Sequence, residues 1–275
     1  MYLETLKHHF GKIGAEIKID NDVPGFRSND FSLDIQVKGK SEVFLLSTPK
    51  NNLLDFIILN TRKDIQHLLL MVTDLSIKKG EKSNKPRITK YLCGHDERQW
   101  FVASVPEDFH AKNVVDAIQA LKPQEAVEFQ KKNKCKKKNR NRRKNKGYIR
   151  QGEWFFMPEP NLDDNNIPIH KKEPIARDGG KPHICENLIR FGGELVYTHS
   201  KYAPNGISEK SYNNFLKKSS IRSLFWSKMI KNAKVYVKGY VKHPDHKTIH
   251  LKIWHRVLMN SENKSWAKRN VVFLD

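Results

Sequence analysis

The N-terminal part of the chain alternates short apolar runs with polar breaks, which is the pattern of a sheet with several strands. The last two of these runs flank a polar stretch at 94–98 and predict a hairpin. The expected strands are 31–37, 43–47, 55–60, 68–73, 88–93 and 99–105. Helical spacing replaces the alternation at 3–10 and 114–121, and Pro123 ends the second helix. Residues 1–125 therefore predict an α+β domain with an antiparallel or mixed sheet.

The C-terminal part, residues 148–275, has the pattern of a smaller β-rich domain with two short helices. A single strand is expected at 148–158, where Pro158 closes an aromatic run. Further strands are expected at 195–197, 235–242, 247–258 and 271–274. Ser208 is a good N-cap for a helix to about residue 218, and a second short helix is expected at 223–231.

A basic segment, residues 126–147, separates the two predicted domains. Pro123 and Glu125 favour a helix start, and the predicted helix runs into this segment. Eleven of the sixteen residues 131–146 are lysine or arginine and none is acidic. Such a run repels itself, so we expect it to be extended or frayed when free. We predict that it holds phosphate groups through Lys136, Lys137, Lys138, Arg140, Arg142, Arg143 and Lys144.

The overall charge supports a polyanionic partner. The formal net charge is +21, and subtracting the eleven basic residues of 131–146 still leaves +10. Nucleic acid, either DNA or RNA, is the partner that such a surface predicts. No aromatic residue interrupts 131–146, so we expect contacts there to be indifferent to base sequence. Two alternatives stay open: a solvated linker, and a cationic protein with no polyanionic partner.

The cysteines and the apolar segments predict a cytoplasmic protein that does not enter a membrane. Three scattered cysteines without a C-x-x-C pair argue against a disulfide framework and a zinc ribbon. The N-terminus lacks the apolar core of a signal peptide. The longest apolar stretches, such as 68–72, are too short to span a bilayer.

The histidines are the main candidates for chemistry. The sequence His-Pro-Asp-His at 243–246 lies between two alternating strands. Matching their apolar faces pairs Val241 with Ile249 and places Val235 opposite His255. In this register His250 points to the polar face and is solvated. His255 lies on the apolar face, where it needs a hydrogen bond, a ligand or an opening.

A three-histidine metal site is the most specific hypothesis from these residues. His183 could join His243 and His246, with His255 as a further candidate, to hold a divalent transition metal such as zinc, iron, nickel or copper. The candidate carboxylate partners are Glu153, Glu186 and Asp245. Two alternatives remain: a structural turn with core histidines, and an acid–base site without metal. No phosphate-binding loop, no nucleophile-elbow motif and no dinucleotide-binding glycine pattern followed by a helix is present, which argues against ATP-driven or hydride-transfer chemistry.

The sequence resembles a family of uncharacterised bacterial proteins. The stretches that carry this resemblance are LCGHDER (92–98), RQGEWFF (150–156), GKPH (180–183), HPDHKT (243–248) and WHRV (254–257). The C-terminal part is also similar to shorter bacterial proteins with an R-Q-G-[DE] strand and an H-P-[DE]-H turn. The resemblance implies no function. It implies only that these stretches occur together.

Three function classes follow. The first is a protein that binds nucleic acid through phosphate contacts of the basic segment. The second is a metal- or histidine-dependent enzyme that acts on nucleic acid or a nucleotide. The third is a protein-interaction module whose basic segment docks on an acidic partner. Three measurements distinguish these classes. They are the salt dependence of nucleic-acid binding, the metal content of the purified protein, and the recovery of a protein partner that stays bound after nuclease treatment.

Overall fold

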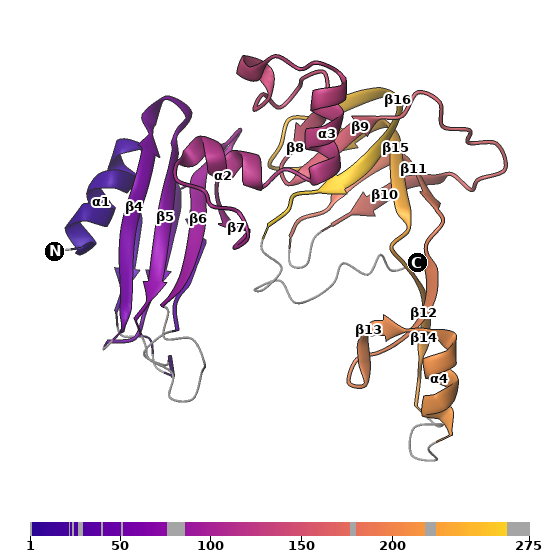
Figure 1. Cartoon of the computed structure of the whole chain (residues 1–275), viewed down its shortest axis with the longest axis horizontal. Coiled ribbons are helices and arrows are strands. Elements are labelled where there is room, and N and C mark those ends of the chain that lie inside the picture. The colour runs from indigo at the N-terminus through magenta and orange to yellow at the C-terminus, as the bar shows by residue number, and fades with distance from the viewer. Residues whose placement is uncertain are drawn as a thin grey trace. The chain divides into compact units, whose positions relative to one another are not determined.

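The computed structural model describes residues 2–262 except 22, 24, 27–29, 40, 51, 76–85, 177–179 and 218–223. The chain has a β-rich α+β fold that separates into two compact units (Figure 1). The first unit holds the described residues up to Glu128, together with Lys136–Asn141 and residues 260–262. The second holds Phe129–Cys135 and Arg142–Met259. Parts of the basic segment thus belong to each unit.

The first unit contains two sheets. The larger sheet is antiparallel, in the order β4 (Leu54–Arg62), β5 (His67–Asp74), β6 (Arg87–Asp96) and β7 (Gln99–Val105). The smaller sheet is mixed, in the order β1 (Ile17–Asp20), β3 (Ser41–Ser47) and β2 (Ser32–Lys38). The helices are α1 (Tyr2–Lys12), α2 (Val114–Ala120), the start of α3 (Gln124–Lys132), and the 3₁₀ turns η1 (Lys63–Ile65) and η2 (Lys137–Asn139). The predicted strands and helices of this region are confirmed.

The larger sheet of the first unit is covered on its two faces. Phe10 of α1 belongs to an apolar cluster with Leu68 and Leu70 of β5. Leu69, between them, belongs to a second cluster with Val114 of α2. Neighbouring strand residues point to opposite faces, so a strand covered on two sides has no polar alternation. This explains why Leu68, Leu69 and Leu70 are all fully buried.

The second unit is built on a six-stranded antiparallel sheet. Its strand order is β10 (His170–Ile175), β11 (His183–Phe191), β15 (Lys234–Lys242), β16 (Ile249–Met259), β9 (Trp154–Pro158) and β8 (Ile149–Gln151). One face is packed around Trp154, Phe156 and Leu188, which are 1%, 0% and 0% exposed. Figure 1 shows these strands side by side.

A smaller module, the aromatic arm (residues 194–231), is inserted between β11 and β15. It contains β12 (Glu194–His199), β13 (Ala203–Ile207), α4 (Glu209–Leu216) and β14 (Ser227–Lys231), with sheet order β13-β12-β14. Ser208 caps α4 by accepting a hydrogen bond from the backbone N–H of Ser211, as predicted for the N-cap. The pair β11–β15 ends with Phe191 opposite Lys234, and the pair β12–β14 starts with Glu194 opposite Lys231.

Several predictions for the C-terminal part are wrong. Residues 148–158 form two strands, because the chain turns at Gly152, whose φ of +56° is left-handed. The helix expected at 223–231 is instead strand β14, which pairs with β12, while residue 223 lies outside the described residues. Strands β10, β11 and β13 were not predicted. The strand expected at 271–274 also lies outside the described residues.

The basic segment is folded locally, in contrast to the extended or frayed form expected from its charge. Helix α3 ends at Lys132, and Lys134 follows with a left-handed φ of +48°. Cys135 is 3% exposed, and its backbone N–H donates to the carbonyl oxygen of Gln130 at 2.9 Å. In the first unit, the buried amine of Lys122 donates to the carbonyl oxygen of Arg140 at 3.0 Å. Local packing therefore holds the segment despite its self-repulsion.

Within the part of the chain that the structure describes, no helix is long and apolar enough to cross a membrane.

Candidate metal centre

Three histidines meet at one end of the six-stranded sheet. His183 is the first residue of β11, and His243 and His246 lie in the turn that joins β15 to β16. Strands β11 and β15 are antiparallel, with Ile184 opposite Lys242. The start of β11 therefore lies beside the end of β15, and this places His183 next to a turn sixty residues later in the sequence.

The three imidazole rings are stacked against one another. The ring centroids of His183 and His243 are 4.2 Å apart, those of His243 and His246 4.6 Å, and those of His183 and His246 5.5 Å. The angles between the ring planes are 26°, 28° and 23° in the same order. One candidate ligand nitrogen from each ring lies within 4.8 Å of the other two.

His183 is the most deeply buried member of this group. Its side chain is 1% exposed, and neither of its ring nitrogens has a hydrogen-bond partner among the described residues. Burial, and then the neighbouring rings of His243 and His246, lower the pKa of His183 to about 3. The ring is consequently neutral at pH 7, which is the form that binds a metal ion.

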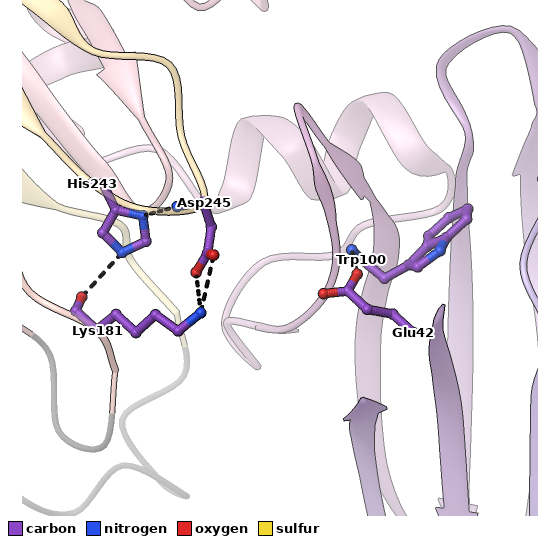
Figure 2. Close-up of polar contacts among 5 residues, drawn as sticks. All are labelled: Glu42, Trp100, Lys181, His243 and Asp245. Atoms are coloured by element: carbon purple, nitrogen blue, oxygen red, sulfur yellow. Dashed lines mark hydrogen bonds and ion pairs between the residues drawn. The ribbon is translucent and has the colours of Figure 1, made fainter. Parts of the chain in front are cut away.

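His243 is oriented by two backbone contacts (Figure 2). Its Nδ1 accepts a hydrogen bond from the backbone N–H of Asp245 at 3.1 Å, so its Nε2 carries the proton and donates to the carbonyl oxygen of Lys181 at 3.2 Å. To ligate a metal, His243 must release one of these two bonds. A typical intramolecular hydrogen bond contributes about 0.5–1.5 kcal/mol, and metal binding has to offset that loss.

The turn itself is held from two sides. The amine of Lys181 contacts the carboxylate of Asp245 at 2.9 Å, as Figure 2 shows. Gln151 of β8 is 1% exposed, and its amide donates to the carbonyl oxygen of Lys247 at 2.7 Å. A Cβ atom built on Gly152 would lie 2.7 Å from Nε2 of His246. The β8–β9 hairpin therefore braces the turn and approaches one of the three rings directly.

The donor set fits a transition metal better than a hard cation. Three neutral imidazoles suit zinc, copper, nickel or iron. Two nitrogens bound to tetrahedral zinc at about 2.05 Å are roughly 3.3 Å apart. The nitrogens here lie within 4.8 Å of one another on stacked rings, so the rings have to approach and turn their nitrogens toward an ion. Among the described residues the group contains no carboxylate: Asp245 pairs with Lys181, and Glu186 accepts from the backbone N–H of Tyr240 at 2.8 Å. Glu153 is also outside the group.

His255 is not part of this group, which corrects its inclusion as a fourth candidate. Val241 pairs with Ile249 as predicted, but the register shifts between Val237 and Gly239. His255 therefore lies opposite Val237, not Val235. Its side chain is 6% exposed, and its Nδ1 donates to the carbonyl oxygen of Ile253 at 2.8 Å. Burial lowers the pKa of His255, and it is a hydrogen-bonded core histidine.

His250 is exposed, as predicted, and its ring stacks on Tyr240 with centroids 4.5 Å apart.

The predicted phosphate contacts of the basic segment differ in exposure. Arg140 and Arg143 are half-buried. The exposed members are Lys136, Lys137, Lys138, Arg142 and Lys144.

Gln151, Gly152 and Lys181 also belong to the site and were not predicted, because none of them has a side chain that typically binds a metal ion. RQGE supplies Gln151 and Gly152, and GKPH supplies Lys181 and His183. These stretches meet the HPDH turn in space. Comparison of the chain with protein-family models, curated proteins and solved structures found no match.

Proposed function

We propose that this chain binds a divalent transition metal ion through His183, His243 and His246. The single observation that carries the proposal is His183, a buried imidazole that faces two others and has no hydrogen-bond partner among the described residues. Leaving a buried polar group unsatisfied costs about 1–3 kcal/mol. A bound ion would accept the lone pair of one ring nitrogen and so remove the cost of leaving that nitrogen unsatisfied.

A purely structural cluster explains these features less well. Core histidines normally satisfy their ring nitrogens, as His255 does with the carbonyl oxygen of Ile253. His183 instead begins a strand beside two further imidazoles at the end of the sheet. Three histidine ligands on zinc leave a fourth position for water or a substrate, and zinc makes such a water acidic near neutral pH. The residues of the chain hold and orient the ion in this proposal, and no particular reaction is assigned.

Metal analysis of the full-length chain, purified without a histidine tag, tests the proposal. Elemental analysis should give about one metal ion per chain, and cobalt substitution should give the absorption bands of a low-symmetry, few-ligand site. His183→Asn and His246→Asn should each weaken binding at least tenfold. His250→Asn, at the exposed histidine of β16, is the matched control and should bind as the unmodified chain does. Absence of bound metal together with absence of cobalt bands would contradict the proposal.

A second candidate function is the binding of nucleic acid by the basic segment. The supporting observation is that most of its cationic side chains are exposed while its backbone is held by Lys122 and by packing of Cys135. A cationic stretch whose backbone is held within its own unit binds phosphates with a smaller loss of chain entropy than a frayed segment does. If the metal and the nucleic acid serve one reaction, labelled oligonucleotides should be cleaved only with metal. Recovery of an acidic protein after nuclease treatment would favour the interaction-module alternative.

A further inference from the structure

The aromatic arm contains a continuous row of rings. Tyr197 of β12 stacks on Tyr212 of α4, with centroids 4.0 Å apart and planes within 5°. Trp226 lies 5.2 Å from Tyr212 and 5.2 Å from His199. His199 in turn lies 5.0 Å from the ring of Tyr202. The row therefore runs from the inside of the arm to its surface.

The inner rings form the core of the arm. Tyr197 is 6% exposed and packs against Tyr212 on one face of the small sheet, while Val196 and Met229, which are also buried, are paired across the other face. A module of fewer than forty residues can bury few apolar side chains, and the stacked rings add to the small core that Val196, Ala203 and Met229 provide. This role accounts for Tyr197, Tyr212 and Trp226.

The outer rings are not explained by that core. Phe225 is 87% exposed and Tyr202 is 41% exposed. Nδ1 of His199 accepts hydrogen bonds from the backbone N–H groups of Lys201 and Tyr202, at 3.1 and 3.3 Å, and this fixes the turn that carries Tyr202. Exposed aromatic rings of this kind are faces on which unpaired bases can stack.

Lysines accompany these rings. The amine of Lys201 lies 5.4 Å from the centre of the Tyr202 ring, and that of Lys228 lies 5.8 Å from the centre of Tyr197. The described residues of the arm include five lysines and two glutamates. This combination of exposed rings and amines differs from the basic segment, where no aromatic residue occurs between 131 and 146.

We propose that the aromatic arm binds an unpaired strand of nucleic acid, with bases stacked on Phe225 and Tyr202 and phosphates held by Lys201 and Lys228. Bases in a duplex are stacked on one another and offer no free face, whereas unpaired bases stack on exposed side-chain rings. The proposal rests on the nucleic-acid-binding function of the basic segment and adds a base-contacting surface to it. It assigns preference for single strands to the arm and general phosphate affinity to the segment.

Fluorescence anisotropy with the full-length chain tests this division. The probes are a labelled pyrimidine-rich 15-mer and the same strand in a duplex, each at several salt concentrations. Phe225→Ala and Tyr202→Ala should each weaken single-strand binding about fivefold or more and change duplex binding by less than twofold. Phe225→Tyr should restore single-strand binding. Phe109→Ala removes a ring that is 40% exposed on the other unit, and it should have no effect.

The outcomes separate the two proposals. If the arm variants bind single strands as the unmodified chain does, while charge removal in the basic segment weakens binding of each probe, the arm proposal is wrong and nucleic-acid binding by the segment stands. If the unmodified chain binds neither probe, both are wrong. An equal loss on each probe in Phe225→Ala would also overturn the arm proposal. Because Phe225 is so exposed, its truncation should leave the thermal midpoint unchanged within about 1 °C.

Discussion

A Cβ atom at Gly152 would lie 2.7 Å from Nε2 of His246, closer than a Cβ atom approaches a non-bonded neighbour in proteins. The φ of Gly152 is +56°, so the turn also uses a backbone conformation that favours glycine. Glycine is thus required here for two separate reasons. One is the shape of the β8–β9 hairpin, and the other is the space that the imidazole occupies.

Gly152→Ala should therefore displace the ring of His246 and weaken metal binding about tenfold to hundredfold, which is the usual effect of altering groups that support metal ligands. Gly192→Ala is the matched control, because Gly192 has a left-handed φ of +69° and no described atom within 4 Å of its Cβ position. Titration with cobalt or zinc measures the two affinities. Equal affinities in the two variants would show that the contact with His246 does not matter.

The buried His255 should make the stability of the chain depend on pH. Its folded pKa is lowered from 6.5 by burial, so the unfolded state binds more protons as the pH falls below about 6.5. Neutral His255 therefore does not destabilise the folded chain above about pH 6.5. The free energy of unfolding decreases as the pH falls from 6.5 toward the lowered pKa of the folded state. His255→Gln should reduce the loss of unfolding free energy between pH 7.5 and 5.5, measured by urea denaturation with a chelator present.

His250→Gln is the control for this measurement, since it removes an exposed histidine from the same strand. It should leave the pH dependence of unfolding as it is in the unmodified chain. An unchanged pH dependence in His255→Gln would mean that burial of His255 does not affect its protonation.

Lys122 should stabilise the first unit through its buried amine. The amine donates to the side chain of Asn141 at 2.7 Å and to the carbonyl oxygen of Arg140 at 3.0 Å, and the residue is 5% exposed. Lys122→Met keeps the volume but leaves these acceptors without that donor, which should cost about 1–3 kcal/mol of unfolding free energy. Hydrogen exchange at residues 139–141 should also speed up. Lys112→Met, at an exposed lysine, should cost less than about 0.5 kcal/mol.

Charge in the basic segment should set the salt dependence of nucleic-acid binding. In a plot of log affinity against log salt, the slope on duplex DNA is negative. Replacing Lys137, Lys138 and Lys144 by glutamine should make it shallower by about 2 to 3, because each lost phosphate contact contributes about 0.9. The same replacement at the exposed Lys12, Lys50 and Lys112 removes equal charge elsewhere. If the two triple variants change the slope equally, the segment has no special role.

Strands β2 to β7 of the first unit could be predicted because they are marked locally, whereas the short β1 and the division into two sheets were not predicted. In β3, for example, a strongly apolar run is bounded by polar residues, and this is enough to locate the strand. Strand β14 is different. Phe225, Met229 and Ile230 have spacings that fit a helix as well as a strand, and the choice depends on pairing with β12, thirty residues earlier. Local pattern contains no information about that partner.

The candidate metal site could likewise be predicted only in part from the sequence. Alternation along two strands placed Val241 opposite Ile249, which locates the turn that holds His243 and His246. It misplaced His255, because the register shift near Gly239 lies inside the strand pair. Gly239 has a φ of +92° and was a visible signal, since an isolated glycine in a strand often marks an irregularity. Gln151 was missed because an amide is not itself a ligand.

The insertion of the aromatic arm has a consequence for how this chain can vary. The arm is entered through Gly192 and Gly193 and left through Asn232 and Ala233, where β11 and β15 already face each other. Those two strands would therefore keep their pairing if a short loop joined Phe191 to Lys234. The arm is therefore an insertion whose length and composition can change without altering the β11–β15 pair. The opposite end of that pair would still position His183 and His243.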